Sequence, residues 1–341
     1  MNKSRLTTNK QVLTFLSEND YANAVKLLLQ IQINEWDKLD DGYKNLSSLK
    51  TKTLWFDSYK IKIQFNAGRI ISTSAKVDVD SINNRSCFLC EENLPEEQKG
   101  IRLLENYLLL CNPYPVFPEH FTIVTANHKP QEISSSFSDF IMLSKLLSDN
   151  HTIIYNGPRC GASAPDHLHF QAGTKYFIPI ENDFNSIKNE FGDTVLDNEQ
   201  LTLTVVDDGL RRFISLESND DRILQKAFNN FYDIYNELNN NNGEPMMNLI
   251  CNYEEEFGWR VIIFLRSKHR PSYYYLKGEN RIMLSPAAID LGGVCIAPLE
   301  KDFEKIDKKI IKEILNEVSL NKDSFVHIKS ALKKIYVSKL P

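Results

Sequence analysis

The sequence predicts a mixed α+β fold that is divided into two lobes. Short stretches of alternating apolar and polar residues indicate strands, and longer stretches with apolar residues three and four positions apart indicate helices. A strand–loop–strand unit also occurs twice, once between Cys111 and His128 and once between Cys251 and His269. Either a duplication or a chance similarity would give this pattern. With 341 residues, the chain is long enough for one large domain or two ordinary ones.

Helices are predicted wherever apolar residues recur on one side of a 3.6-residue period. In the clearest case, Leu224, Phe228, Phe231 and Leu238 share one side of an amphipathic segment. The predicted helices cover residues 9–40, 137–147, 221–238 and 301–318.

Strands are predicted where the period is two. Tyr59, Ile61, Ile63 and Phe65 alternate with Lys60, Lys62 and Gln64, which is typical of a half-buried strand. The predicted strands cover residues 59–65, 70–73, 103–111, 121–124, 152–155, 167–172, 201–206, 247–251 and 259–265.

Loops are predicted between these elements. Pro113, Pro115 and Pro118 exclude a central strand from residues 112–120. Polar composition predicts a turn at 66–69 and further loops at 78–85 and 239–245. We therefore expect an N-terminal helical region over residues 1–57, a first lobe over 58–215 and a second lobe over 216–341.

The composition excludes several classes of protein. Hydrophobic residues make up 42% of the chain and charged residues 25%, which is ordinary for a globular protein and excludes disorder over most of the chain. A net charge of -5 without a dense basic block argues against binding to nucleic acid. Apolar runs such as 260–265 are too short to cross a membrane, and the first ten residues predict no signal peptide. Only Cys87 and Cys90 among six cysteines lie close together, which favours the cytoplasm.

The segment at residues 160–173 carries the clearest chemical signal. On a strand, His167, His169 and Gln171 lie on one face, whereas Leu168 and Phe170 face the other way. A solvated strand face with two incidental histidines is the alternative, but only seven histidines occur in the chain. The sequence therefore favours a functional row of polar side chains.

This row suits the transfer of a phosphoryl group. A neutral imidazole is a competent nucleophile near pH 7 and can form a covalent bond with phosphorus. Gln171 could donate a hydrogen bond to a non-bridging oxygen of the same group. The preceding loop adds the backbone N–H groups around Gly161, the hydroxyl of Ser163 and the cation of Arg159.

The His-x-His-x-Gln row after Gly-Ala-Ser resembles the nucleotidyltransferase and phosphorylase branch of the histidine-triad superfamily. This branch includes galactose-1-phosphate uridylyltransferase, the GDP-hexose phosphorylases and diadenosine tetraphosphate phosphorylase. The segment from Asn112 to His128 is similar to the Pro-x-His strand of the superfamily, and Cys87 with Cys90 is similar to its optional zinc pair. Together these matches cover about residues 60–175.

The resemblance implies a histidine-triad-like antiparallel sheet with flanking helices, and a second lobe of the same kind that has lost the motif. It implies that His169 is the nucleophile, that Gln171 holds the nucleotidyl intermediate, and that His167 is structural or a metal ligand. Three residues separate Ser163 from His167, whereas relatives usually have two.

A structural zinc ion is expected at Cys87 and Cys90. Two thiolates need two further ligands for tetrahedral zinc, and histidines must supply them because no other cysteine is close. The resemblance implies His128 and His167 as these ligands, with His120 as the substitute for His128. A half-buried turn without metal is the alternative.

The resemblance also implies substrate contacts by Asn66 and Arg69, and by Asn112 and Tyr114 at the nucleobase or ribose. Further candidates for the substrate site are His120, Arg159 and Gly161, together with Arg260 for an acceptor phosphate. For Arg260, the alternative is a solvated strand end in the cationic segment 260–270.

We expect a two-step reaction. His169 would attack the α-phosphorus of a nucleoside-diphosphate sugar or a dinucleoside polyphosphate, and phosphate or a sugar phosphate would then accept the nucleotidyl group. The resemblance allows a homodimer. The alternatives are a non-catalytic protein that binds a nucleotide or sugar phosphate, and a nucleotide hydrolase, which Gln171 disfavours.

Overall fold

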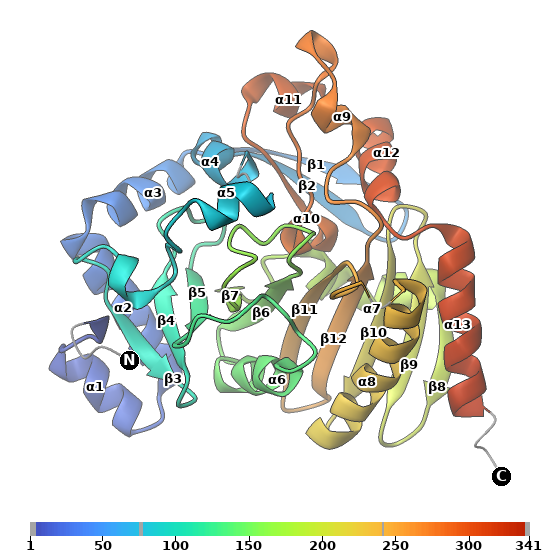
Figure 1. The fold of residues 1–341 in the computed structure, drawn as a ribbon, viewed down its shortest axis with the longest axis horizontal. Coiled ribbons are helices and arrows are strands. Elements are labelled where there is room, and N and C mark those ends of the chain that lie inside the picture. Colours follow the sequence, from blue (N-terminus) through green and yellow to red (C-terminus); the bar gives the residue numbers. More distant parts are fainter. Residues whose placement is uncertain (1–4, 75–77, 241, 338–341) are drawn as a thin grey trace.

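The computed structural model describes residues 5–74, 78–240 and 242–337. Its centre is a ten-stranded sheet in which every pair of neighbouring strands is antiparallel (Figure 1). In spatial order, the strands are β3 (Gly100–Leu103), β4 (Tyr107–Cys111), β5 (His120–Thr125), β7 (His169–Thr174), β6 (His151–Asn156), β11 (Met247–Glu254), β12 (Gly258–Leu265), β10 (Arg212–Ser218), β9 (Thr202–Asp207) and β8 (Gly192–Asp197).

The large sheet consists of two halves with the same connectivity. The order β3-β4-β5-β7-β6 in one half corresponds to β8-β9-β10-β12-β11 in the other. Along the chain, each half has a helix between its third and fourth strands. Helix α6 (Phe137–Leu146) lies between β5 and β6, and α8 (Asp221–Leu238) lies between β10 and β11. The halves meet where β6 pairs with β11, and Ile154 lies opposite Ile250 there.

The strand register relates individual residues of the two halves. Ile154 lies opposite Gln171 in the first half, and Ile250 lies opposite Ile262 in the second. A pseudo-two-fold axis through the Ile154–Ile250 pair therefore relates Gln171 to Ile262 and, two residues earlier, His169 to Arg260.

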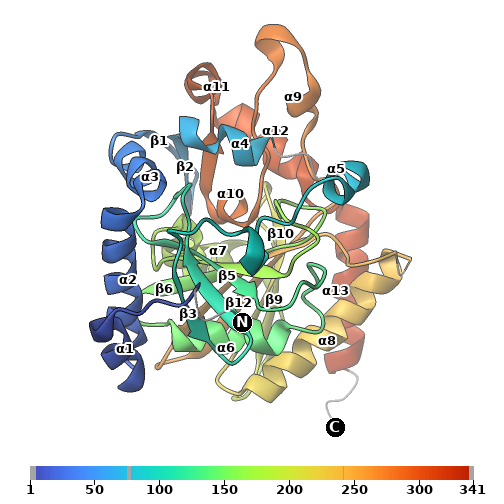
Figure 2. The same cartoon turned by 60° about the vertical axis from the view of Figure 1, so that its left-hand side comes forward.

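Helices cover both faces of the large sheet. Helices α1 (Lys10–Ser17), α2 (Tyr21–Glu35), α3 (Asp37–Ser47), α6, α8 and α13 (Lys322–Val337) contribute to the apolar core on one face. The other face packs against α7 (Pro179–Phe191), α10 (Ala288–Gly292), α11 (Glu300–Lys305), α12 (Lys308–Val318) and a small sheet (Figure 2). The small sheet contains β1 (Lys50–Trp55), β2 (Lys60–Phe65) and β13 (Val294–Ala297).

The predicted α+β fold, with an antiparallel sheet and flanking helices, is confirmed. Helix α8 has the predicted bounds, and the predicted N-terminal helical region divides into α1, α2 and α3. No helix in the described part of the chain is both long and apolar enough to span a membrane.

Several local predictions were wrong. Residues 70–73 form the short helix α4 (Ile70–Thr73) instead of a strand, because β1 and β13 occupy both edges of β2. The predicted loop at 78–85 contains α5 (Val79–Asn83). The predicted helix at 301–318 is divided into α11 and α12, since the side chain of Asp307 caps a new helix by accepting from the N–H of Ile310. The sequence patterns also missed β1, α7, β8, β10, α9 (Ser272–Tyr275), α10, β13 and α13.

The repeat in the sheet falls on other segments than predicted. The sequence pattern paired the segment from Cys111 to His128 with the segment from Cys251 to His269. Topology instead relates β6 and β7 to β11 and β12. The predicted lobe boundary at residue 215 is untested. Strands β8 to β10 pair within the half of the sheet that contains β12. We therefore propose that the boundary between the two lobes lies between β7 and β8.

Candidate active site

His169 lies at the start of β7 with its imidazole held in one tautomer. Its Nδ1–H donates to the carbonyl oxygen of His167 at 2.8 Å, which leaves the lone pair of Nε2 available. The residue is 4% exposed, and burial lowers the pKa of the ring to about 4. The imidazole is therefore neutral near pH 7, as a nucleophile must be.

Gln171 follows on the same strand face and is oriented by His120. The N–H of Val116 donates to Nδ1 of His120 at 3.2 Å, so the proton of the ring lies on Nε2. This Nε2–H donates to Oε1 of Gln171 at 3.0 Å. Because the amide oxygen is occupied, the two N–H donors of Gln171 face away from His120.

His120 is not placed as predicted. It is fully buried behind Gln171, and both ring nitrogens are bonded within the protein, so it neither contacts substrate nor replaces His128. Burial, aided by the charge of Arg69, lowers the pKa of His120 to about 3. A neutral ring can accept from Val116 and donate to Gln171 at the same time.

His167 also departs from the prediction. It precedes β7, and its N–H donates to the carbonyl oxygen of Ala164 in a turn, so it does not share a strand face with His169. Its ring instead approaches the thiols of Cys87 and Cys90, with Nδ1 to Sγ distances of 3.4 Å and 3.6 Å.

Cys87, Cys90, His128 and His167 form a cluster that could hold a metal ion. Their four ligand atoms lie within 4.8 Å of one another, and Nδ1 of His128 is 3.2 Å from Sγ of Cys90. The Nε2–H of His167 donates to the carbonyl oxygen of Thr125 at 2.9 Å. This bond leaves Nδ1 unprotonated and directed at the thiols, as a metal ligand requires.

The loop from 157 to 168 contains three further candidates. Gly161 has a φ of +112°, and a Cβ there would lie 2.7 Å from Cβ of Ala287, so glycine is required. Ser163 is half-buried in this loop. Arg159 is exposed and donates to the carbonyl oxygens of Glu244 at 2.8 Å and Asn242 at 3.4 Å. It therefore braces the loop after α8, and its phosphate role stays a prediction.

Arg69 and Asn66 anchor the proline-rich loop between β4 and β5. Arg69 donates to the carbonyl oxygen of Tyr114 at 3.0 Å, and Asn66 donates to that of Pro115 at 3.3 Å. Oδ1 of Asn112 accepts from the N–H of Tyr114 at 2.9 Å. The four residues predicted to contact substrate from these segments are thus brought together, and the charge of Arg69 acts on His120, next to Gln171.

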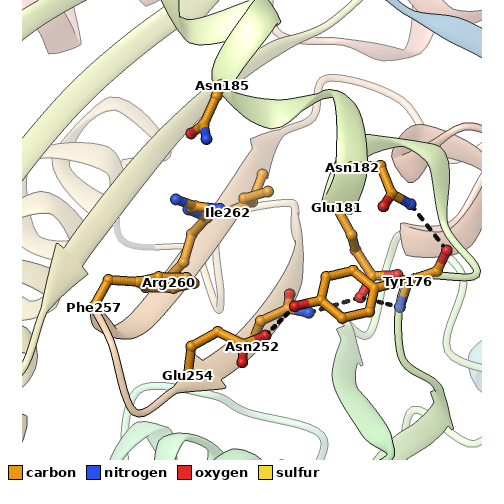
Figure 3. Close-up of a pocket in the computed structure, with 9 residues that line it drawn as sticks. All are labelled: Tyr176, Glu181, Asn182, Asn185, Asn252, Glu254, Phe257, Arg260 and Ile262. Carbon is orange, nitrogen blue, oxygen red and sulfur yellow. Dashed lines mark hydrogen bonds between the residues drawn. The ribbon is translucent and has the colours of Figure 1, made fainter.

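Arg260 lies in a different place from His169. The strands β6 and β11 separate β7 from β12, so the two residues are roughly 14 Å or more apart at about 4.8 Å per strand. Arg260 lines a separate pocket of about 270 Å³ between α7 and the ends of β11 and β12 (Figure 3). Its guanidinium pairs with Glu217 at 2.8 Å and stacks on Phe184 and Phe257, so it cannot bind a phosphate held at His169.

Gln131 is a buried residue of this site that the sequence patterns missed. Its side chain bonds to the backbone of His169, but a lone glutamine in a loop between a strand and a helix has no distinctive sequence signal.

Two family models match the chain, over separate segments. Residues 28–174 match a domain of unknown function, DUF4922, and residues 194–339 match the GDPGP1-like C-terminal domain. Yeast Ap4A phosphorylase Apa2 in complex with AMP has a similar structure, with a TM-score of 0.56 and 17% identity over 86% of this chain and 96% of that one. The fold is histidine-triad-like.

Curated relatives of this histidine-triad-like chain support its predicted branch. Protein APA1 of Saccharomyces cerevisiae is 30% identical in an alignment 158 residues long, which covers 38% of this chain and 47% of that protein. Galactose-1-phosphate uridylyltransferase of Bacillus subtilis is 29% identical in an alignment 120 residues long, which covers 30% of this chain and 23% of that protein. The chain thus spans less than half of either relative, and its resemblance to the nucleotidyltransferase and phosphorylase branch is confirmed.

Proposed function

We propose that the protein is a nucleotidyltransferase that works through a covalent nucleotidyl-histidine at His169. The observation that carries this proposal is the neutral imidazole whose Nδ1–H is bonded to the backbone and whose Nε2 lone pair is available. The substrate would be a nucleoside-diphosphate sugar or a dinucleoside polyphosphate. The acceptor would be inorganic phosphate or a sugar phosphate.

In the first step, Nε2 of His169 attacks the α-phosphorus of the substrate. The new N–P bond forms as the bond from phosphorus to the bridging oxygen breaks, and the sugar phosphate or nucleotide leaves as an anion. The Nδ1–H bond to the His167 carbonyl supports the positive charge that develops on the ring. The N–H donors of Gln171 would stabilise the non-bridging oxygens.

In the second step, an oxygen of the acceptor phosphate attacks the same phosphorus and the N–P bond breaks. His169 is released in its neutral form, and the product is a nucleoside diphosphate or a new nucleotide sugar. An amide at position 171 supplies no general base to activate water, which favours transfer over hydrolysis. This argument also makes a simple hydrolase the weaker alternative.

Substrate contacts are proposed on the side of Gln171 where Arg69 lies. Arg69 is half-buried, and among the described residues its guanidinium donates only to Tyr114, so its other donors suit a phosphate oxygen. Asn66, Asn112 and Tyr114 would contribute to the nucleoside side of the pocket. Gly161 and Ser163 would approach the phosphates from the loop before β7.

The substrate class is supported by what the similar proteins bind. One solved structure is yeast Ap4A phosphorylase Apa2 in complex with Ap4A, and another is in complex with AMP. A uridylyltransferase is among the curated relatives. These proteins have in common that they bind nucleotides or transfer a nucleotidyl group.

We also propose that Cys87, Cys90, His128 and His167 hold a structural zinc ion. Two thiolates and two imidazoles form a common donor set for tetrahedral zinc. The metal would fix His167, whose carbonyl oxygen orients His169, and would take no part in the chemistry. In the described part of the chain, all six cysteines are free thiols, which supports a reducing compartment such as the cytoplasm. The homodimer also stays a prediction.

The experiment is an assay with Ap4A, GDP-glucose and UDP-glucose, each labelled in the α-phosphate. Without acceptor, we expect an acid-labile protein adduct, and with added inorganic phosphate we expect a labelled nucleoside diphosphate. Binding without an adduct or turnover for every compound would favour a non-catalytic nucleotide-binding protein. An adduct that survives in the His169→Ala variant would overturn the assignment of the nucleophile.

A further inference from the structure

We propose that Gln131 is a positioning residue that fixes the orientation of His169, an inference that rests on the proposed function. The side chain of Gln131 is 1% exposed, and both its amide oxygen and its amide nitrogen bond to the backbone of His169. The N–H of His169 donates to Oε1 of Gln131 at 2.8 Å, and Nε2 of Gln131 donates to the carbonyl oxygen of His169 at 3.0 Å. Its second N–H donates to the carbonyl oxygen of Asn156 at 2.9 Å.

The bonds of Gln131 replace a missing part of the sheet. The ladder between β6 and β7 ends at the pair of Ile154 and Gln171, so Asn156 and His169 are not paired across it. In the second half of the sheet, the equivalent residues Asn252 and Arg260 are paired directly. Gln131 therefore bridges two strands at the point where the first half opens.

The ladder between β6 and β7 ends early because a long loop of the proposed site joins these two strands. Beyond Asn156, the chain leaves β6 for the long loop that carries Gly161 and Ser163, and it returns only at His169. His169 stays paired with Val124 of β5, but on the β6 side an open ladder would leave its backbone N–H and carbonyl without the partners that strand pairing normally provides. Gln131 supplies these partners, since it holds both polar backbone groups of the nucleophile.

The position of Gln131 is itself fixed by backbone contacts. Its N–H donates to the carbonyl oxygen of Pro165 at 3.1 Å, and the N–H of Leu168 donates to the carbonyl oxygen of Lys129 at 2.7 Å. The segment that carries Gln131 is thus bound to the end of the loop before β7. An error of about 1 Å in the attacking atom can cost roughly 100-fold in rate, so this clamp should control the chemical step.

The test compares Gln131→Leu with Gln32→Leu, which removes a similar clamp elsewhere. Gln32 is fully buried in α2, donates to the carbonyl oxygen of Glu97 at 3.1 Å, and accepts from the N–H of Lys99 at 2.8 Å. Each variant leaves buried backbone groups unpaired, so both should lower the melting temperature by a few degrees.

Only Gln131→Leu should lower the rate constant of adduct formation, by roughly 10- to 100-fold in single turnovers at saturating substrate. The substrate is whichever of Ap4A, GDP-glucose and UDP-glucose gives the highest adduct yield with the unmodified protein, and its affinity should not change. If Gln131→Leu does not fold, the isosteric Gln131→Glu takes its place, because its second oxygen faces the carbonyls of His169 and Asn156.

A second readout does not depend on turnover. In spectra of ¹⁵N-labelled histidine side chains, assigned with His169→Gln, the unmodified protein and Gln32→Leu should contain His169 only as the Nδ1–H tautomer. The Gln131 variant should contain both tautomers. A wild-type tautomer and a wild-type adduct rate in that variant would overturn the role of Gln131. If the unmodified protein forms no adduct, the proposed function fails, and the tautomers still decide the positioning role.

Discussion

The two halves of the large sheet share a topology but differ in chemistry. At equivalent positions, the first half has His169 and Gln171, and the second has Arg260 and Ile262. Nε2 of His169 has no hydrogen bond to any described residue, whereas the guanidinium of Arg260 is paired with Glu217 and stacked on Phe184. The comparison teaches that this fold supplies two equivalent positions, and that the side chains decide which position can carry chemistry.

The loops of the two halves reinforce this difference. Residues 157–168 join β6 to β7 and bring in the segment next to the metal cluster, whereas only residues 255–257 join β11 to β12. A short turn keeps the ladder closed, so Asn252 and Arg260 stay paired. The long loop opens the ladder and needs Gln131 to close it again.

The largest effect should come from replacing each of the two equivalent residues, His169 and Arg260, with alanine. His169→Ala should lower adduct formation by at least about 10⁴-fold, because the atom that bonds to phosphorus is removed. Arg260→Ala should leave the rate of adduct formation unchanged and should lower only the free energy of unfolding, since Glu217 loses a partner. Single-turnover labelling and urea denaturation measure the two effects. Loss of the adduct in Arg260→Ala would contradict the separation of the two halves.

The next effect concerns the metal cluster, which only the first half has among the described residues. Protein purified without chelator should contain near-stoichiometric zinc, and Cys87→Ser should lose it. The free energy of unfolding should fall by on the order of 5 kcal/mol, because metal binding stabilises only the folded state. Elemental analysis and thermal denaturation measure this, with Cys111→Ala as the control that keeps its zinc. If the unmodified protein contains no zinc and Cys87→Ser is as stable as the unmodified protein, the segment with Cys87 and Cys90 is a turn without metal.

Gln171 and Ile262 provide a matched pair for the amide donor. Gln171→Ala should lower the rate constant of phosphorolysis by roughly 100- to 1,000-fold, since it removes donors to the charged non-bridging oxygens. Ile262→Val should cost about 1 kcal/mol of stability without changing the rate. Steady-state assays with varied phosphate separate the rate constant from the binding of the acceptor. An unchanged rate in Gln171→Ala would assign the stabilisation of the intermediate to another group.

The smallest effect concerns Glu244, which joins the two halves. It precedes β11, yet it accepts from the hydroxyl of Tyr155 at 2.6 Å and from the N–H of Ile133 at 2.6 Å. Burial raises the pKa of its carboxyl from 4.5 to about 8, so the folded state holds a proton that the unfolded state has lost at neutral pH. The stabilisation is complete below pH 4.5 and is lost as the pH rises through about 8.

Between pH 5 and pH 8.5, the free energy of unfolding should therefore fall by on the order of 2 kcal/mol, and Glu244→Gln should reduce this fall. Urea denaturation at the two pH values measures the change, and exposed Glu237→Gln should behave like the unmodified protein. An equal fall in Glu244→Gln would assign the pH dependence to other groups.

Local patterns predicted much of the fold and the centre of the site. The amphipathic pattern of residues 221–238 gave α8 its bounds, because helix periodicity is a local property. The spacing of two on β7 placed His169 and Gln171 on one face. The cluster of Cys87, Cys90, His128 and His167 also formed as expected, although its zinc remains a proposal.

Other parts of the site depended on contacts between distant residues. Arg260 was predicted to bind phosphate from its charge, but the structure pairs it with Glu217. Arg159 donates to the loop after α8, and its phosphate role stays a prediction. His120 was predicted as a substrate contact, but it lies buried behind Gln171. Charge and residue type do not say which partner a side chain will meet after folding.

By itself, the sequence determined the identity and spacing of the reactive groups, because strand geometry makes the direction of successive side chains a local matter. Only the tertiary structure decided that β6 pairs with β11, so that two lobes form one sheet and Arg260 occupies the position equivalent to His169. It also placed Gln131 against the backbone of His169. Such pairings join residues far apart in the chain, and their free energy depends on the packing of the whole core rather than on any single segment.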